Sequence, residues 1–346
     1  MAYPATGIDK AEDFHNGVLY TGTGAEQTIS GVGFEPGLTW CKDRTNSYDH
    51  VWYDAARGAT KRITSNTDTV ESDQAQGLKS WNSDGFVVGT GSNINNNTNE
   101  FVSWNWKAGT TSGLTGGTIT PSAYSINTTS GFGAYAYTGN GTSGATIPHG
   151  LGAAPKFMII KCLDTAGTDW VSWISPMAVN EYLYLNGTAT TASDTAFMNS
   201  VLPSSTLITL GDKGNVNANT KTFIVYAWAE KKGYSSFGEY TGNGNANGAF
   251  IYTGFRPAFI LLKKSNAAIN WVAMDDKRQG FNPNTSELYP SATSAECDTG
   301  CYRVDLLSNG FKMRNSSPTI NDGSYVYAAF AEFPLVSSND VPGVAR

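Results

Sequence analysis

Tyr20-Thr21-Gly22-Thr23-Gly24 is the stretch that decides the fold, because closely similar stretches return twice later in the chain. The second reads Tyr137-Thr138-Gly139-Asn140-Gly141 and the third Tyr240-Thr241-Gly242-Asn243-Gly244. Each copy leads to a Gly-x-x-Pro turn and then to an apolar segment that ends in lysine. Internal similarity of this kind indicates a chain built from related structural units.

The repeated prolines and the repeated lysines are spaced by the same intervals along the chain. The prolines and lysines that bound the apolar segments are Pro36 and Lys42, Pro155 and Lys161, and Pro257 and Lys263. The interval between successive prolines equals the interval between successive lysines in both cases. Chance seldom produces such a match, so the chain contains three divergent copies of one unit.

Two more features keep this register to within a residue or so. A second strand begins at His50, Trp170 and Trp271, and each copy closes on an aromatic strand at residues 101–106, 223–228 and 325–330. In places the closing strand carries aromatic residues at alternate positions, which sets them on one face of a sheet.

The local composition predicts strands throughout. Short runs rich in β-branched and aromatic residues are bounded by Gly, Asn, Asp and Pro. We therefore predict an all-β fold of three tandem, divergent, jelly-roll-like β-sandwich domains. The expected domains are 1–109, 131–232 and 233–335, with a Thr-, Gly- and Ser-rich linker at 110–130 and a C-terminal arm at 336–346. The short second junction predicts that copies two and three lie close together, with copy one on a longer connection.

Composition excludes several classes of function. The 346 residues carry a net charge of -6, which offers no basic surface for nucleic acid. No apolar run reaches the roughly 18 residues that cross a bilayer, and the first residues lack the basic and apolar parts of a secretory signal. We expect no nucleic-acid partner and no membrane insertion.

No catalytic site is predicted. The three histidines, His15, His50 and His149, occupy unrelated positions in the repeat and accompany no hydrolase, phosphate-loop or metalloprotease motif. Asp54 with Arg57, and Asp275 with Arg278, recur in copies one and three and are interpreted as repeated ion pairs or turn braces. Copy two has neither the acid nor the arginine, so no site is common to all copies.

No metal or cofactor is predicted either. Cys297 and Cys301 are close enough for a local disulfide or for two zinc ligands, but no second Cys or His pair completes a four-ligand site. Cys41 and Cys162 are expected to be buried. Residues 93–99 and the Asp84-Gly85 turn carry oxygen atoms for calcium but lack the dense carboxylates of such sites.

The nine tryptophans are expected mainly in the core. Trp52, Trp81 and Trp173 have no aromatic equivalent in every copy, so an exposed position stacked on sugar rings is their alternative.

Three runs of residues carry a resemblance to a known family. The runs Tyr20-Thr21-Gly22-Thr23-Gly24, Ile29-Ser30-Gly31-Val32-Gly33-Phe34-Glu35-Pro36 and Asp54-Ala55-Ala56-Arg57-Gly58-Ala59 resemble a repeated domain of unknown function in tail and virion proteins of marine tailed phages. The later segments 252–259 and 327–332 are similar to a second form of it, and residues 341–346 are typical of its ending. The resemblance implies a phage particle and no catalytic residues.

The functional expectation is a non-enzymatic virion protein, assembled in the host cytoplasm and released by lysis. An exterior tail fibre or spike adhesin is favoured, with other virion proteins as partners, a homotrimer as the assembly and a host-surface glycan as the ligand. A capsid decoration or tail-wall protein that bridges neighbouring subunits is the alternative, and a carbohydrate-active enzyme is the third.

Overall fold

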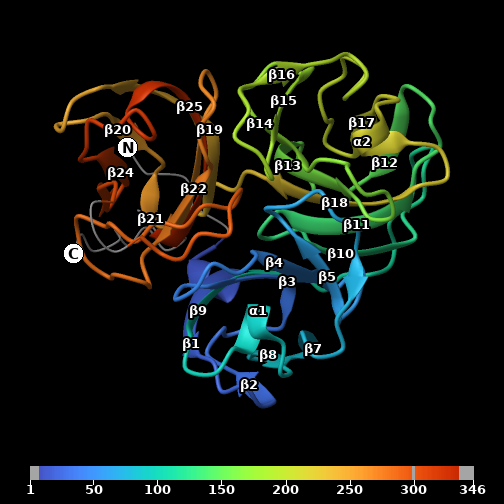
Figure 1. The fold of residues 1–346 in the computed structure, drawn as a ribbon. Coiled ribbons are helices and arrows are strands. Elements are labelled where there is room, and N and C mark those ends of the chain that lie inside the picture. Colours follow the sequence, from blue (N-terminus) through green and yellow to red (C-terminus); the bar gives the residue numbers. More distant parts are fainter. Residues whose placement is uncertain (1–7, 298–300, 335–346) are drawn as a thin grey trace.

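The computed structural model describes residues 8–297 and 301–334, and these form an almost entirely antiparallel β protein (Figure 1). The predicted all-β class is confirmed. The chain forms lobe 1 (residues 8–109), lobe 2 (110–232) and lobe 3 (233–334 without 298–300), seen at the bottom, upper right and upper left of Figure 1. Among the described residues no helix is long and apolar enough to cross a bilayer.

Lobe 1 combines a six-stranded sheet, β1-β9-β3-β4-β5-β6, with a three-stranded sheet, β2-β8-β7. Its elements are η1 (Ala11–Asp13), β1 (His15–Thr21), β2 (Gln27–Ile29), β3 (Pro36–Asp43), β4 (Val51–Asp54), β5 (Lys61–Thr64), β6 (Ser72–Asp73), β7 (Leu78–Asn82), β8 (Gly85–Val88), α1 (Ser92–Asn95) and β9 (Glu100–Lys107).

Lobe 2 has a seven-stranded sheet, β10-β11-β18-β13-β14-β15-β16, and a two-stranded sheet, β12-β17. Its elements are β10 (Ala123–Asn127), β11 (Phe132–Thr138), β12 (Ala145–Pro148), β13 (Pro155–Cys162), β14 (Val171–Ile174), β15 (Glu181–Tyr184), β16 (Ala192–Ser193), β17 (Leu207–Leu210), α2 (Gly214–Asn217) and β18 (Thr222–Ala229).

Lobe 3 has a four-stranded sheet, β19-β25-β21-β22, and a three-stranded sheet, β20-β24-β23. Its elements are β19 (Ser235–Asn243), β20 (Phe250–Tyr252), β21 (Phe255–Lys264), β22 (Val272–Asp275), β23 (Val304–Leu307), β24 (Gly310–Met313) and β25 (Asp322–Pro334).

The large sheets of the three lobes share one strand order. In each, the strand of the repeated Tyr-Thr-Gly motif pairs with the closing strand, and the closing strand pairs with the strand that carries the repeated lysine. That lysine strand pairs in turn with the second strand. These series are β1-β9-β3-β4, β11-β18-β13-β14 and β19-β25-β21-β22. Lobe 2 adds β10 at the edge.

The tyrosine of the repeated motif anchors each lobe in the same way. Its ring stacks on an aromatic ring of the closing strand, with centroids 5.1, 5.2 and 4.7 Å apart in lobes 1, 2 and 3. The stacked pairs are Tyr20–Phe101, Tyr137–Phe223 and Tyr240–Tyr325. The tyrosine hydroxyl donates to a backbone carbonyl, at Ile94, Val216 and Ile320 respectively.

A fully buried asparagine follows each of these carbonyls, and we call the set Asn95, Asn217 and Asn321 the asparagine latch. The side-chain oxygen of each latch residue accepts a backbone N–H of the motif turn, at 2.8, 2.9 and 3.2 Å. In lobe 1 its amide group also donates to Ala25 O and Gly89 O. The close approach requires glycine in the motif, because a Cβ on Gly22 would lie 2.0 Å from a backbone carbonyl oxygen.

The central strands of the large sheet of lobe 1, β3, β4 and most of β9, are buried on both faces. Alternate residues point to opposite sides. Cys41, Val51 and Tyr53 face the small sheet and pack with Phe86 and Val88. Residues of the other face, Trp40, Trp52, Trp104 and Trp106 among them, belong to a second cluster that extends through all three lobes.

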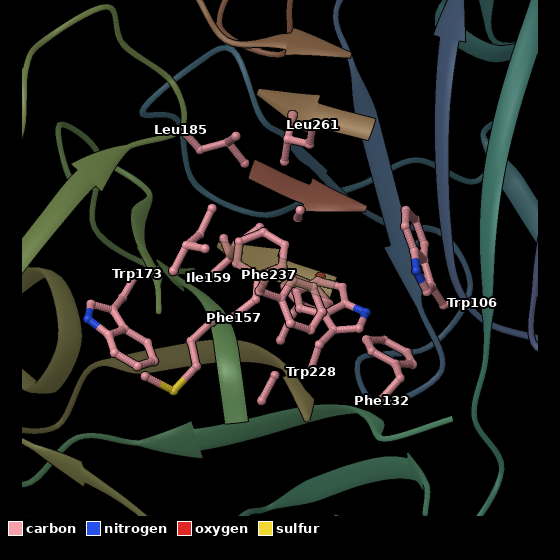
Figure 2. Close-up of a cluster of buried hydrophobic side chains, with 14 of the residues drawn as sticks. Trp106, Phe132, Phe157, Ile159, Trp173, Leu185, Trp228, Phe237 and Leu261 are labelled. Atoms are coloured by element: carbon pink, nitrogen blue, oxygen red, sulfur yellow. The ribbon is translucent and has the colours of Figure 1, made fainter. Parts of the chain in front are cut away.

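That second cluster is one continuous core at the centre of the molecule. Trp106, Trp228 and Phe330, which occupy equivalent positions on the three closing strands, meet there edge to face. Their ring centroids lie 6.0, 5.4 and 6.3 Å apart. Figure 2 shows part of this cluster, with Trp106 of lobe 1, Phe157 and Trp228 of lobe 2, and Phe237 of lobe 3.

Backbone hydrogen bonds close the lobes into a ring around this core. Glu71 N donates to Leu163 O (2.8 Å), Thr191 N to Ser265 O (2.9 Å) and Glu296 N to Arg44 O (2.9 Å), which joins lobe 1 to 2, 2 to 3 and 3 to 1. Lobe 1 therefore contacts both other lobes, so the longer connection expected after copy one does not separate it from them.

The segment 110–130 also differs from the expected linker. Its second half contains β10, which pairs with β11 along the edge of the lobe 2 sheet. Residue Thr110 bridges to Ile126 within the same segment. Hydrogen bonding thus assigns this part of the chain to lobe 2, while the expected arm at 336–346 lies outside the described residues.

Candidate functional site

The three histidines are all buried, and none faces solvent. His15 packs against Trp106 and Phe330, with centroid distances of 4.8 and 5.2 Å. Burial lowers the pKa of His15 to about 3, so its ring is neutral at physiological pH. In lobe 2, His149 Nδ1 accepts the N–H of Leu151 at 3.2 Å, and its Nε2 lies 3.1 Å from Ser204 O. These contacts are structural.

His50 occupies the place of a tryptophan at the joint between two lobes. Its equivalents Trp170 and Trp271 each donate Nε1–H to a backbone carbonyl of the preceding lobe, Thr64 O at 3.0 Å and Tyr184 O at 2.8 Å. His50 lies against the corresponding carbonyl, that of Tyr289 in lobe 3. Burial and the nearby charges of Lys42 and Arg278 hold the pKa of His50 well below its usual value.

Both predicted ion pairs are present and buried. Arg57 Nε lies 2.6 Å from Asp54 Oδ2, and Arg278 Nε lies 2.6 Å from Asp275 Oδ2. Each carboxylate also accepts a hydrogen bond from a neighbouring lobe, from Tyr226 Oη at 2.6 Å and from Trp104 Nε1 at 2.9 Å. Each carboxylate thus links an arginine of its own lobe to a donor of the next lobe and braces the joint between them.

The third joint replaces this polar arrangement with an apolar one. Ile174 occupies the position of the two aspartates in lobe 2. Ala328 occupies the corresponding position of Tyr226 and Trp104 in lobe 3. Both residues are fully buried. The acid that lobe 2 lacks is therefore matched by the hydrogen-bond donor that lobe 3 lacks.

The lysines that end the apolar segments, Lys42, Lys161 and Lys263, are buried and bind backbone carbonyls. Lys161 Nζ reaches Asp68 O of lobe 1 at 3.2 Å, and Lys263 Nζ reaches Thr188 O of lobe 2 at 2.9 Å. Burial lowers the pKa of each of the three to about 8. With at most 1% of their surface exposed, they hold loops and joints rather than reach a ligand.

The oxygen atoms considered for calcium mostly form hydrogen bonds within turns. Asp84 accepts the N–H groups of Gly31 and Gly33 at 3.0 and 2.8 Å. Asn95 is a latch residue, and its side chain is fully hydrogen-bonded. Asn93 lines a pocket of about 160 Å³ whose charged lining residue is Arg62, with no carboxylate among its described lining residues. Such a lining disfavours a cation.

The tryptophans considered for sugar stacking are not on the surface. Trp52 and Trp173 are buried, and Trp81 is half-buried with its Nε1 donating to Thr39 Oγ1 at 3.2 Å. Their assignment to the core is confirmed for Trp52 and Trp173.

Cys297 and Cys301 form a disulfide, which resolves the alternatives left by their spacing, and Cys41 and Cys162 are free and buried. The carboxylate of Glu287 lies beside the disulfide and accepts a hydrogen bond from Tyr289 Oη at 2.7 Å. Burial raises the pKa of Glu287 to about 7. With both sulfurs bonded to one another, this group does not offer the four free ligands of a zinc site.

A pocket of about 390 Å³ lies in lobe 3, lined by Arg256, Asp276, Gly280, Phe281, Asn282 and Glu332. Arg256 lies near the start of β21, Asp276 directly follows β22, and Glu332 lies near the end of β25. Phe281 is 67% exposed. The pocket thus combines charged groups from three adjacent strands with an exposed aromatic ring.

The charged groups of this pocket are incompletely satisfied. Arg256 forms an ion pair with Glu332, but its Nε has no hydrogen-bond partner among the described residues, and neither has Asp276 Oδ1. Burial raises the pKa of Asp276 to about 7, with Asp275 and Glu332 acting in the same direction and Lys277 and Arg256 against it. The pocket can therefore both donate and accept hydrogen bonds.

This combination belongs to lobe 3 alone. The positions of Arg256, Asp276 and Glu332 carry Glu35, Ala55 and Ala108 in lobe 1 and Ala154, Ser175 and Glu230 in lobe 2. Asp276 stands beside Asp275 in the sequence and belongs to none of the repeated landmarks. A comparison of the three copies for charges confined to one of them is the signal that would have found the pocket.

Comparisons with known proteins give a family but no function. No curated protein and no solved structure matches the chain. One family model, described as a domain of unknown function (DUF7483), matches residues 10–334 and thus spans all three lobes. The chain therefore belongs to the DUF7483 family.

Proposed function

We propose that this chain is a non-enzymatic structural and adhesive component of a bacteriophage particle, an exterior tail fibre or spike protein that contacts the host surface. The phage assignment depends on the resemblance of its repeated motifs to a domain of tail and virion proteins. Other virion proteins are its proposed partners, and the virion is its proposed location.

One observation carries the structural part of this proposal: the candidate catalytic groups recognised in the sequence are used inside the molecule. The histidines are buried, and Asp54 and Asp275 are held by an arginine and by a donor from the next lobe. We infer that the lobes are three divergent copies of one two-sheet unit, because the asparagine latch and the interlobe bonds recur in all of them. A ring of this kind suits a rigid support for surface loops.

The adhesive part follows from the uneven distribution of exposed aromatic rings. Among the described residues the aromatic side chains with large exposed fractions are Phe250, Tyr252 and Phe281, and all three lie in lobe 3. Exposed aromatic rings beside polar groups are a common means of recognising sugars. Lobe 3 is accordingly the part that we assign to the host surface.

Electron microscopy of the phage that encodes the chain tests the proposal, with antibody-bound gold on the intact particle as the label. A few labelled positions at the tail tip or fibres are expected. Many labelled positions over the head would instead favour the alternative, a decoration protein whose three unlike lobes bridge neighbouring subunits. Absence of the chain from purified particles would refute both.

A second test addresses the adhesive role directly. Purified protein should compete with phage for host cells and lower the adsorption rate, whereas protein with lobe 3 blocked by a specific antibody fragment should not compete. Release of reducing sugar from host polysaccharide by the purified chain would contradict the non-enzymatic assignment.

A further inference from the structure

We propose that the lobe 3 pocket binds a single neutral saccharide ring, with Phe281 stacked on the face of the ring and Arg256, Asp276 and Glu332 bonded to its hydroxyl groups. This inference rests on the proposed adhesive function and names the class of ligand that the adhesive surface recognises. It follows from the shape, the hydrogen-bonding groups and the charge of the pocket.

The size and shape of the pocket fit one ring. Its volume of about 390 Å³ is at the small end of ligand sites, which commonly span about 300–1,000 Å³. Gly280 precedes Phe281 with a φ of 75°, a backbone conformation that favours glycine. The ring of Phe281 lines the pocket and is left two-thirds exposed.

The polar lining matches hydroxyl groups, which both donate and accept. Arg256 keeps a buried Nε–H without an acceptor, and Asp276 Oδ1 is a buried oxygen without a partner. Unsatisfied buried polar atoms carry a free-energy cost, and a ligand that supplies their partners removes it. A sugar with neighbouring hydroxyl groups supplies both kinds of partner from one ring.

The charge of the lining selects among sugars. One guanidinium faces two carboxyl groups, and the charge of Arg256 is already engaged by Glu332. An acidic sugar or a phosphate would add a negative group to this site. That group would be repelled by Glu332 and Asp276, and Arg256 is already paired with Glu332. A neutral ring avoids that repulsion.

Calorimetric titration of the full chain with galactose, glucose, mannose and N-acetylglucosamine tests the inference, with glucuronic acid and arginine amide as charged comparisons. A hexose has about 12 non-hydrogen atoms, and at the modest efficiency per atom of ordinary ligands this corresponds to a dissociation constant of about 1 mM. We expect at least one neutral sugar to bind in this range and glucuronic acid to bind more weakly.

Three variants locate the binding. Phe281→Ala should weaken it about five- to tenfold through lost stacking, and Glu332→Gln about tenfold or more through lost charged hydrogen bonds. Phe250→Ala removes an exposed aromatic ring of the same lobe outside the pocket and should bind like the wild type. Thermal melting of each variant shows whether the fold is retained.

The proton of Asp276 supplies an independent readout. The groups near this carboxyl are Lys277, Asp275, Glu332 and Arg256. Loss of its proton leaves Asp276 as a charged acceptor, which binds a hydroxyl group more strongly, so affinity should rise as the pH rises through about 7, and Asp276→Asn should bind with little pH dependence.

Absence of saturable binding of any neutral sugar up to about 10 mM, ten times the expected constant, would overturn the inference. So would equal affinity in Phe281→Ala and wild type, or a preference for glucuronic acid or arginine amide. Because this titration uses the isolated protein, it can fail while imaging still places the chain on the tail. Imaging can likewise fail while the sugar binds.

Discussion

Replacing Phe259 by alanine removes a lobe 3 ring that packs in the shared core against three tryptophans of lobe 1. Its centroid lies 5.2 Å from that of Trp104, 5.9 Å from that of Trp106 and 6.1 Å from that of Trp40. A buried Phe→Ala change costs about 3–5 kcal/mol. We expect the upper part of this range, because several aromatic contacts are lost together.

The location of that loss is more informative than its size. If the three lobes share one core, the variant lowers the free energy of unfolding of the whole ring. Hydrogen exchange measured by mass spectrometry should then show faster exchange in β9 of lobe 1 and β18 of lobe 2 by the same factor as in β25 of lobe 3. Urea denaturation should remain a single transition at a lower midpoint.

Tyr252→Ala serves as the control, since it removes a 58% exposed ring from the same lobe and should change stability by no more than about 0.5 kcal/mol. Loss of protection confined to lobe 3 in Phe259→Ala would refute the reasoning. That outcome would describe three independent sandwiches in tandem.

Tyr226→Phe removes the hydroxyl that donates to Asp54 across the joint of lobes 1 and 2, and urea denaturation should report a loss of about 1.5–3 kcal/mol; an unchanged midpoint would contradict this bond. Asn217→Ala empties the latch of lobe 2 and should cost roughly 2 kcal/mol or more, because a buried backbone N–H and its carbonyl neighbours lose their partners, whereas the exposed Asn219→Ala should cost almost nothing. Burial raises the pKa of Asp276 to about 7, so the folded protein keeps a proton that the unfolded chain releases near its ordinary pKa of about 4. The free energy of unfolding therefore falls from about pH 4 to about pH 7 through this group, and a wild-type slope in Asp276→Asn would disprove the assignment.

The strand order could be predicted in part from the sequence, because the repeated landmarks lie on the paired strands of the large sheets. The role of the tyrosine motif could not, since its partner lies far along the chain. Tyr20 donates to the residue before Asn95, and Tyr137 to the residue before Asn217, but the intervals between motif and latch differ. A search for residues at constant spacing in the sequence therefore does not find the pairing of the motif tyrosine with the latch.

The shared core was hidden for a different reason. Aromatic residues at alternate positions, such as Trp104 and Trp106, indicate which residues share a face but not what that face meets. A sandwich with its own core and a sheet buried between a small sheet and a common centre produce the same local pattern. His50 illustrates this limit: its register with Trp170 and Trp271 was visible, whereas its place at a joint between lobes depends on tertiary contacts.

The pocket could be predicted least. Arg256, Asp276 and Glu332 are widely separated in sequence, and β21, β22 and β25 bring them together. Phe281 belongs to a long connection in lobe 3, between β22 and β23, that has no counterpart of equal length in the other lobes.

The closed cycle of lobes has a consequence for how the chain can be rearranged. The first described element, η1, packs against β25, the last, so the ring is continuous in space where it is interrupted in the backbone. A circularly permuted chain that starts within the largely exposed segment 111–117 and joins lobe 3 to lobe 1 by a linker should fold to the same ring. The order in which the lobes leave the ribosome is then a matter of gene layout rather than of architecture.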